Sequence, residues 1–314
     1  MNKWFRKGNS RRYHRVDMPV RFFLIPSSPI KDKDIYATGT DYFPPSLQRQ
    51  IQAKKELTRQ AVSRIQEQNE ILTEIFEEMI QFIEFFGRCA VSISQGQSPK
   101  KDPQYWMSVK EHLKGFKTIV KIKASSPKTY QYLQMIEIKY LTFLKRMIYS
   151  INHSTPTHFE VEGDLPVGFK VDEMMTIFKS TKFSKIPLVQ AILNLSEFME
   201  SYLEVYRQIN ADNYLKQYPQ EWPLQIANVS ASGIALLLNK KFEQYMRVDI
   251  HIYIESLDKV LDFDGSVVDI RTDESTQKER VAINFEFPEG HLQDILQLEI
   301  QKQEVKECMK FDLS

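Results

Sequence analysis

The sequence predicts an α+β protein in which an all-helical domain is inserted into a small antiparallel all-β domain that is followed by a helix. Three observations predict this fold class. Apolar and polar residues alternate over 18–26 and again from about 221 to 287, which is the period of strands. Between these segments, residues 46–215 show helical spacing and nothing that requires a strand. Helical spacing then returns with Leu292, Ile295, Leu296 and Ile300 on one side.

Composition restricts the class of protein. The chain has 314 residues, enough for about two domains, and its 42% hydrophobic and 12% aromatic residues supply the material for folded cores. Lys and Arg number 42 against 41 Asp and Glu, so the formal charge is only +1. Such a chain has no overall basic field to attract nucleic acid or an anionic membrane. Any bound anion must therefore be held by a local group of residues.

Targeting and redox features predict a cytoplasmic protein. The basic residues near the N-terminus are not followed by the apolar segment of a secretion signal, and no run of about 18 uncharged apolar residues could span a membrane. The two cysteines, Cys89 and Cys308, lie far apart in unlike segments, which indicates neither a disulfide framework nor a zinc site. We therefore expect no metal and no membrane insertion.

The first helical segment runs from Ser46 to about Ile93. Apolar residues recur there at alternating steps of four and three, and no Gly or Pro occurs before Gly87, which predicts one long helix. Its first half has Lys, Thr and Gln at several positions of the apolar stripe and is a poor isolated coiled coil. Its second half is dense in apolar side chains and should lie in the core.

Three further helical segments follow. Asp102-Pro103 begins one that runs to about residue 122. The stretch "SSPK" at 125–128 offers a serine cap and a proline at the first helical position, which predicts a helix over 127–152. A loop over 152–169 then precedes a last helical block over 171–215 that is interrupted near Pro187.

The strands after residue 220 predict an antiparallel meander that closes into a small barrel or sandwich. Turns rich in Asp, Ser and Glu separate the stretches 221–239, 248–254, 259–271 and 281–287. This sheet needs one more strand to cover its first edge, and the isolated run at 18–26 is the candidate. An insertion between 26 and 221 is permissible, because the tip of a hairpin is exposed and its two ends are close together. The predicted domains are thus 1–35 with 221–314, and an inserted domain over 36–220.

Two short polar motifs stand next to the predicted strands. Arg11, Arg12 and Arg15 crowd into five residues before the first strand, and "NVSASG" supplies Asn228, Ser230 and Gly233 within the later strands. An Arg-x-x-x-Arg loop, a strand, an Asp/Asn-x-Ser-x-x-Gly motif, a meander and a helix occur in that order. In this order and in its motifs the chain resembles the PilZ domain, the bacterial receptor module for cyclic di-GMP, over about residues 1–30 and 220–310. The distance between the two motifs departs from the usual pattern.

The resemblance implies a PilZ-like barrel and a cyclic di-GMP site. Its residues would be Arg11, Arg12, Arg15, Asn228, Ser230 and Gly233. The chemistry agrees, since an arginine fork fits the O6 and N7 acceptors of guanine and can also bind a phosphate. The Asn amide and the Ser hydroxyl can bond to base and phosphate, while a glycine lets ligand or backbone approach closely.

Other interpretations stay open at this level. The arginines could form a solvated tail, and "NVSASG" could be a strand-entry turn. We find no Gly-x-Ser-x-Gly, His-Glu-x-x-His or phosphate-binding Gly-rich motif, so an enzyme is not expected. We expect a receptor that couples ligand binding to a helical domain or to a protein partner, or self-associates through that domain. The alternative is a helical interaction or scaffold protein whose PilZ-like barrel does not bind nucleotide.

Overall fold

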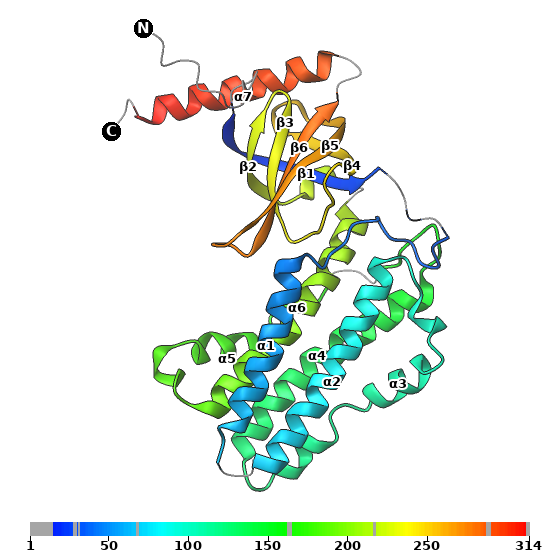
Figure 1. Ribbon diagram of the computed structural model, residues 1–314, viewed down its shortest axis with the longest axis vertical. Helices are drawn as coiled ribbons and strands as arrows, with labels where there is room; N and C mark the ends of the chain where they lie inside the picture. The colour runs from blue at the N-terminus through cyan, green and yellow to red at the C-terminus, as the bar shows by residue number, and fades with distance from the viewer. Residues whose placement is uncertain are drawn as a thin grey trace. The chain divides into compact units, whose positions relative to one another are not determined.

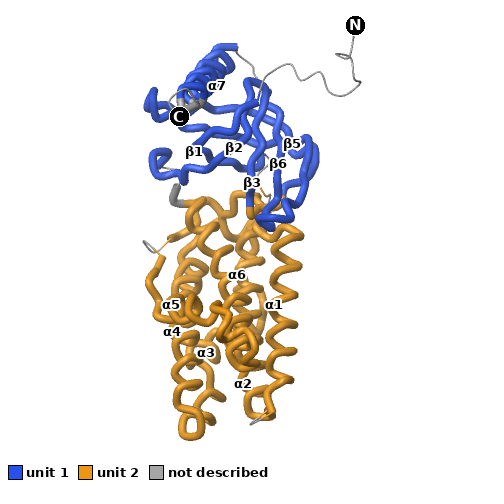
Figure 2. The backbone as a smooth tube through the Cα atoms, turned by 90° about the vertical axis from the view of Figure 1, so that its left-hand side faces the viewer, with its two compact units in different colours: residues 1–28, 215–238, 242–314 blue, residues 29–214, 239–241 orange. Residues whose placement is uncertain are grey.

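The computed structural model describes residues 15–27, 30, 32–66, 69–161, 165–215, 218–286 and 290–311. These residues form two compact units, which Figure 2 shows in different colours. One unit, here called the barrel unit, comprises 1–28, 215–238 and 242–314. The other, the helical unit, comprises 29–214 together with the short segment 239–241. The predicted α+β fold class is confirmed.

The barrel unit is a closed antiparallel barrel followed by a helix (Figure 1). The order of its strands around the barrel is β1-β2-β3-β6-β5-β4, and every neighbouring pair is antiparallel. The elements are β1 Val16–Pro26, β2 Leu224–Ser230, β3 Gly233–Leu238, β4 Arg247–Ile254, β5 Lys259–Asp273, β6 Lys278–Glu286 and α7 Gly290–Phe311, with 3-10 turns at Pro219–Glu221 and Glu255–Leu257.

The barrel core is formed by apolar residues at every second position of the strands. In β4, Val248, Ile250 and Ile252 are fully buried, whereas the residues between them are partly exposed. This is the burial pattern of a strand with one face inside a closed sheet. Leu296 and Ile300 of α7 belong to the same core. The final helix therefore buries one of its faces on the barrel.

The strand β1 closes the barrel. It pairs with β2 over Val16–Arg21 and with β4 over Arg21–Pro26, so both of its edges are bonded. The prediction that the isolated run at 18–26 supplies the missing strand is confirmed. A closed barrel leaves no unpaired edge, which is why a strand so distant in sequence is needed here.

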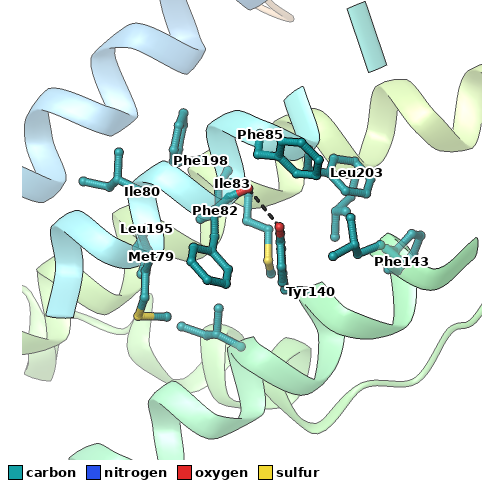
Figure 3. Packing of buried hydrophobic residues seen from close by; sticks show 14 of the residues in the cluster. Met79, Ile80, Phe82, Ile83, Phe85, Tyr140, Phe143, Leu195, Phe198 and Leu203 are labelled. Atoms are coloured by element: carbon teal, nitrogen blue, oxygen red, sulfur yellow. Dashed lines mark hydrogen bonds between the residues drawn. The ribbon is translucent and has the colours of Figure 1, made fainter. Parts of the chain in front are cut away.

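The helical unit is built around one large apolar core. Figure 3 shows its centre, where side chains of α2, α4 and α6 pack together. The elements are α1 Pro45–Ser63, α2 Asn69–Ser94, α3 Tyr105–His112, α4 Pro127–His153, α5 Lys170–Phe178 and α6 Pro187–Leu215, with 3-10 turns at Pro99–Lys101, Thr118–Ile122 and Thr181–Phe183. The helix predicted over 127–152 is confirmed as α4, and Pro127 is its first residue. The Ser126 side chain makes no capping hydrogen bond, so that part of the prediction is wrong.

The prediction of one helix over 46–93 is also wrong. The helix α1 ends at Ser63 and α2 begins at Asn69. The Nδ2 group of Asn69 donates to the carbonyl oxygens of Ile65 at 2.7 Å and Val62 at 3.2 Å. Carbonyl groups near the end of a helix have no partner within that helix, so this side chain stabilises the break. The apolar spacing runs on across the break, and periodicity alone could not show it.

The polar first half of this segment, α1, is stabilised because the chain folds back and packs it against α2. The helix α1 packs against α2, and the Arg59 guanidinium bonds both carboxylate oxygens of Glu77, at 2.7 and 3.0 Å. The same packing buries Ile51, Ala61 and Val62. A helix with so few apolar residues is marginal alone and is stabilised by tertiary contacts.

A partly buried histidine packs against the core of the helical unit. The ring of His112 stacks on Phe82, with centroids 3.9 Å apart. The Tyr140 hydroxyl donates to the carbonyl oxygen of Phe82 at 3.0 Å, a bond drawn in Figure 3, so its oxygen accepts from Nδ1–H of His112 at 2.8 Å. Burial lowers the pKa of His112 to about 4, because a charged imidazolium would lose hydration there. His112 is therefore a neutral hydrogen-bond donor near pH 7.

Candidate ligand-binding site

The motif "NVSASG" forms the turn between two neighbouring strands. Asn228 and Ser230 lie at the end of β2, and Gly233 is the first residue of β3. Ser230 pairs with Gly233, and Asn228 pairs with Ala235 two positions further from the turn. The motif thus lies at one end of the barrel. Asn228 and Val229 in β2 are paired with β1, and Gly233 in β3 is paired with β6.

Ser230 is used within this turn. Its side chain is 1% exposed, and its Oγ donates to the carbonyl oxygen of Gly233 at 3.2 Å. The same oxygen accepts from the backbone N–H of Ser232 at 3.4 Å. A serine hydroxyl that bonds to nearby backbone groups is a common way to fix a turn. Ser230 therefore holds the shape of the motif.

Gly233 is required by the packing of strands. A Cβ atom at this position would lie 2.3 Å from the carbonyl oxygen of Ile283 in β6, a backbone atom. The residue has no positive φ angle, so the reason for glycine is this close approach and not an unusual conformation. Asn284, which is exposed, lies opposite Gly233 in β6.

Asn228 is bonded to a residue of the first strand. Its Nδ2 group donates to Oδ1 of Asp17 at 2.7 Å, and the two residues are 211 positions apart in the sequence. The strand register places them directly opposite each other in β1 and β2. Neither Asp17 nor Asn284 was predicted from the sequence to lie beside the motif. The sequence signal that could have indicated them was the alternation of the strands, which puts these two positions on the outer face of the barrel.

Arg15, the described residue of the first motif, lies at the same end of the barrel as the second motif. Arg15 is partly buried and comes one residue before Val16, which pairs with Val229, so it lies at the level of Ser230. Arg11 and Arg12 lie outside the described residues. The structure thus brings Arg15, Asn228, Ser230 and Gly233 to one end of the β1–β2–β3 sheet, although a long helical segment separates Arg15 from the others in sequence.

The part of the chain that the structure describes has no candidate metal site and no candidate membrane-spanning helix. Within it, no group of three or more His, Cys, Asp or Glu side chains is arranged so that it could hold a metal ion. Among the same residues, no helix has the length and apolar content needed to cross a membrane.

The fold is a small closed β-barrel with polar residues gathered at one end of three neighbouring strands. The family model described as "PilZ domain" matches residues 208–301, and this part of the chain is a PilZ domain. PilZ domains are receptor domains for cyclic di-GMP. The matched range begins in α6 and excludes β1, so the strand that closes the barrel comes from outside it.

No curated protein sequence matches the chain. Among solved structures, the chain is similar to the inhibitor of motility MotI/DgrA of Bacillus subtilis, with 18% sequence identity and a TM-score of 0.24. That similarity covers 28% of this chain and 44% of the other, which is less than half of its length.

Proposed function

We propose that the protein is a cyclic di-GMP receptor whose ligand binds across the end of β1, β2 and β3. The ligand-binding residues are Arg11, Arg12, Arg15, Asn228, Ser230 and Gly233. One observation carries the proposal: Arg15 and the "NVSASG" turn, far apart in sequence, lie at the same level of adjacent strands of a PilZ domain. A cytoplasmic receptor would encounter this second messenger directly.

The roles of these residues follow from the chemistry of the ligand. Cyclic di-GMP carries two phosphates and two guanines, and each guanine presents O6 and N7 as a pair of acceptors. An arginine fork can bond both acceptors, and a neighbouring arginine can bind a phosphate. The Nδ2 group of Asn228 is already bonded to Asp17, which leaves its Oδ1 to accept from a guanine N–H.

One observation favours the alternative that the barrel does not bind nucleotide. The Ser230 hydroxyl closes its own turn and is almost fully buried, so the motif has a structural use that needs no ligand. A binding measurement decides between the two functions.

Binding of cyclic di-GMP is expected with micromolar or better affinity, on the order of −8 kcal/mol. Binding of cyclic di-AMP and GMP should be much weaker, because adenine has a donor where guanine has O6 and GMP offers only half of the contacts. Arg15→Ala and Arg11→Ala should each cost about 1–3 kcal/mol of binding through loss of a charge-assisted pair. Isothermal titration calorimetry measures both effects.

A matched control for the arginine variants is Arg271→Ala. Arg271 is exposed on β5, where it pairs with Asp269 at 2.9 Å, and should not affect binding. Circular dichroism checks that each variant is folded. If saturating cyclic di-GMP gives neither heat nor a thermal shift, the protein is not a receptor and the scaffold alternative holds.

We also propose that ligand binding changes the dynamics of the helical unit or of a protein partner that it holds. The helical segment leaves the barrel after β1 and returns at β2, so both of its connections are strands of the proposed site. A ligand that ties Arg15 to the turn after β2 binds better to one arrangement of these strands, and such a difference in affinity shifts populations.

Hydrogen exchange tests this coupling. On addition of cyclic di-GMP, exchange should slow at residues 5–17 and 226–234, and it should also change at 46–55 and 205–220 near the connections. Unchanged exchange in every helical peptide, with protection of the site alone, would contradict the coupling while leaving the receptor function intact.

A further inference from the structure

The helix α7 has two apolar faces. Its inner face carries Leu296 and Ile300, which are buried in the barrel core. Its outer side carries Leu298, Val305 and Met309, which are 56%, 53% and 62% exposed. An ordinary surface helix is apolar on the core side and polar on the other, so the outer set is unusual.

These three outer residues form one narrow stripe, here called the outer stripe. Steps of seven and four residues bring side chains back to the same side of a helix, within about 40° of one another at 100° per residue. Lys302 occupies the remaining position of the series 298, 302, 305 and 309, whose steps are four, three and four. A narrow stripe with these steps is typical of a coiled-coil seam and not of a face that covers a globular core.

The second half of α7 exposes the side chains of Val305 and Met309 from the outer stripe. After Ile300, no described side chain of the helix is buried, whereas Leu296 and Ile300 fix the first half on the barrel. Figure 1 shows α7 as one continuous helix. Because the barrel already holds the helix in shape, a partner would not have to pay the cost of forming it.

The charges beside the outer stripe favour a second copy of this chain in antiparallel orientation. A parallel pair would place Lys302 against Lys302, a repulsive contact in the seam. An antiparallel pair places Leu298 opposite Met309 and Lys302 opposite Val305 of the other copy. The aliphatic stem of Lys302 can then cover that valine, while its ammonium keeps its 2.6 Å ion pair with Glu299.

The same antiparallel alignment also matches charges at the flank of the seam. Residues 299 and 306 hold equivalent flanking positions, and antiparallel helices bring such positions of two copies together. The exposed Lys306 of each copy therefore approaches Glu299 of the other, twice by symmetry.

We propose that two copies of this protein associate through the outer stripe of α7, in an antiparallel two-fold dimer. The inference goes beyond the receptor function and does not depend on it. Three apolar side chains per copy are fewer than a standard interface contains, so the dissociation constant should be on the order of 10⁻⁵ M. The dimer would therefore form and dissociate with protein concentration.

Analytical ultracentrifugation of the full chain without nucleotide tests the dimer. The weight-average mass should rise with concentration from 37.0 kDa toward twice that value. Val305→Glu should weaken association at least about tenfold, because two carboxylates would enter the seam. The matched control is Met107→Glu, since Met107 is 68% exposed on α3 of the helical unit and is not part of the outer stripe, and its change should leave association unaltered. A monomer at every concentration, or equal effects of the two variants, overturns the proposal.

Cysteine cross-linking tests the orientation. In a Cys308→Ser background only the buried Cys89 remains, so added cysteines report the seam. The double variant Leu298→Cys with Met309→Cys should cross-link two chains on mild oxidation, because these positions face each other in the antiparallel pair. Leu298→Cys alone should not, because the two copies of residue 298 lie about 16 Å apart along an antiparallel pair and face each other only in a parallel one. Cross-linking by Leu298→Cys alone overturns the antiparallel orientation, and cross-linking by neither variant overturns the interface.

Discussion

Replacing Gly233 with alanine is expected to destabilise the barrel unit by about 2–3 kcal/mol. The added Cβ would lie 2.3 Å from the carbonyl oxygen of Ile283, and a backbone atom of a central strand cannot move aside as a flexible side chain can. The two strands would have to separate where β3 pairs with β6. Valine at the same position should cost more, because its branched side chain meets the same strand.

The control for this prediction is Gly290→Ala. No atom lies within 4 Å of a Cβ at Gly290, so its replacement should change stability by about 0.5 kcal/mol or less. Hydrogen exchange during urea unfolding separates the two units, which a single spectroscopic signal would average. The expected result for Gly233→Ala is lost protection in β3 and β6 with unchanged helical peptides. Wild-type stability of this variant would show that the strands can adjust and that the close approach is not a constraint.

Removing the carboxylate of Asp212 is expected to destabilise the helical unit by about 3–5 kcal/mol. Asp212 is 8% exposed and accepts from the Tyr42 hydroxyl at 2.6 Å and from Lys240 Nζ at 2.5 Å. In Asp212→Ala, the largely buried ammonium of Lys240 loses its counter-charge and the Tyr42 hydroxyl loses its acceptor. Both groups would then bear the cost of desolvation.

Two further variants separate the charge effect from a general packing defect. The double change Asp212→Ala with Lys240→Met should recover a large part of the loss, since it removes the unpaired charge as well. Lys241→Ala is the matched control, because its neighbouring ion pair with Asp41 is exposed and 3.7 Å long, and should cost about 0.5 kcal/mol. Chemical unfolding followed by exchange of α6 peptides provides the free energies. An Asp212→Ala variant that is no less stable than Lys241→Ala would contradict the proposed role of the buried pair.

The contacts of Asp212 and Asp41 also show that the short segment 239–241 stabilises the helical unit. Residues 239–241 follow β3 directly but belong to the helical unit, where Lys240 meets Asp212 and the Lys241 N–H donates to the Asp41 carbonyl at 2.5 Å. No pattern in "LNKKF" indicated this, because two adjacent lysines on a turn normally remain in solvent.

The candidate site was predictable only in its composition. The residue types Arg, Asn, Ser and Gly could be recognised because arginine forks, amides and hydroxyls are the groups that bind guanine and phosphate. Their proximity could not be derived from spacing, since Arg15 reaches the level of Ser230 only through the register of β1 with β2. Asp17 was missed for the same reason, as its bond to Asn228 joins two strands that are distant in sequence.

The sequence by itself determined which segments of this protein are strands and which are helical, although not every helix boundary. Alternation defined the strands, helical spacing and Pro127 defined α4, and the apolar run at 18–26 was identifiable as a strand that needed a partner. Side-chain periodicity follows from the local geometry of the backbone, so it is present in the sequence of each segment. Only the tertiary structure decided which segments meet: the closure of the barrel by β1, the break before Asn69 and the close approach at Gly233. These depend on contacts between residues far apart in the chain, whose free energy no local pattern records.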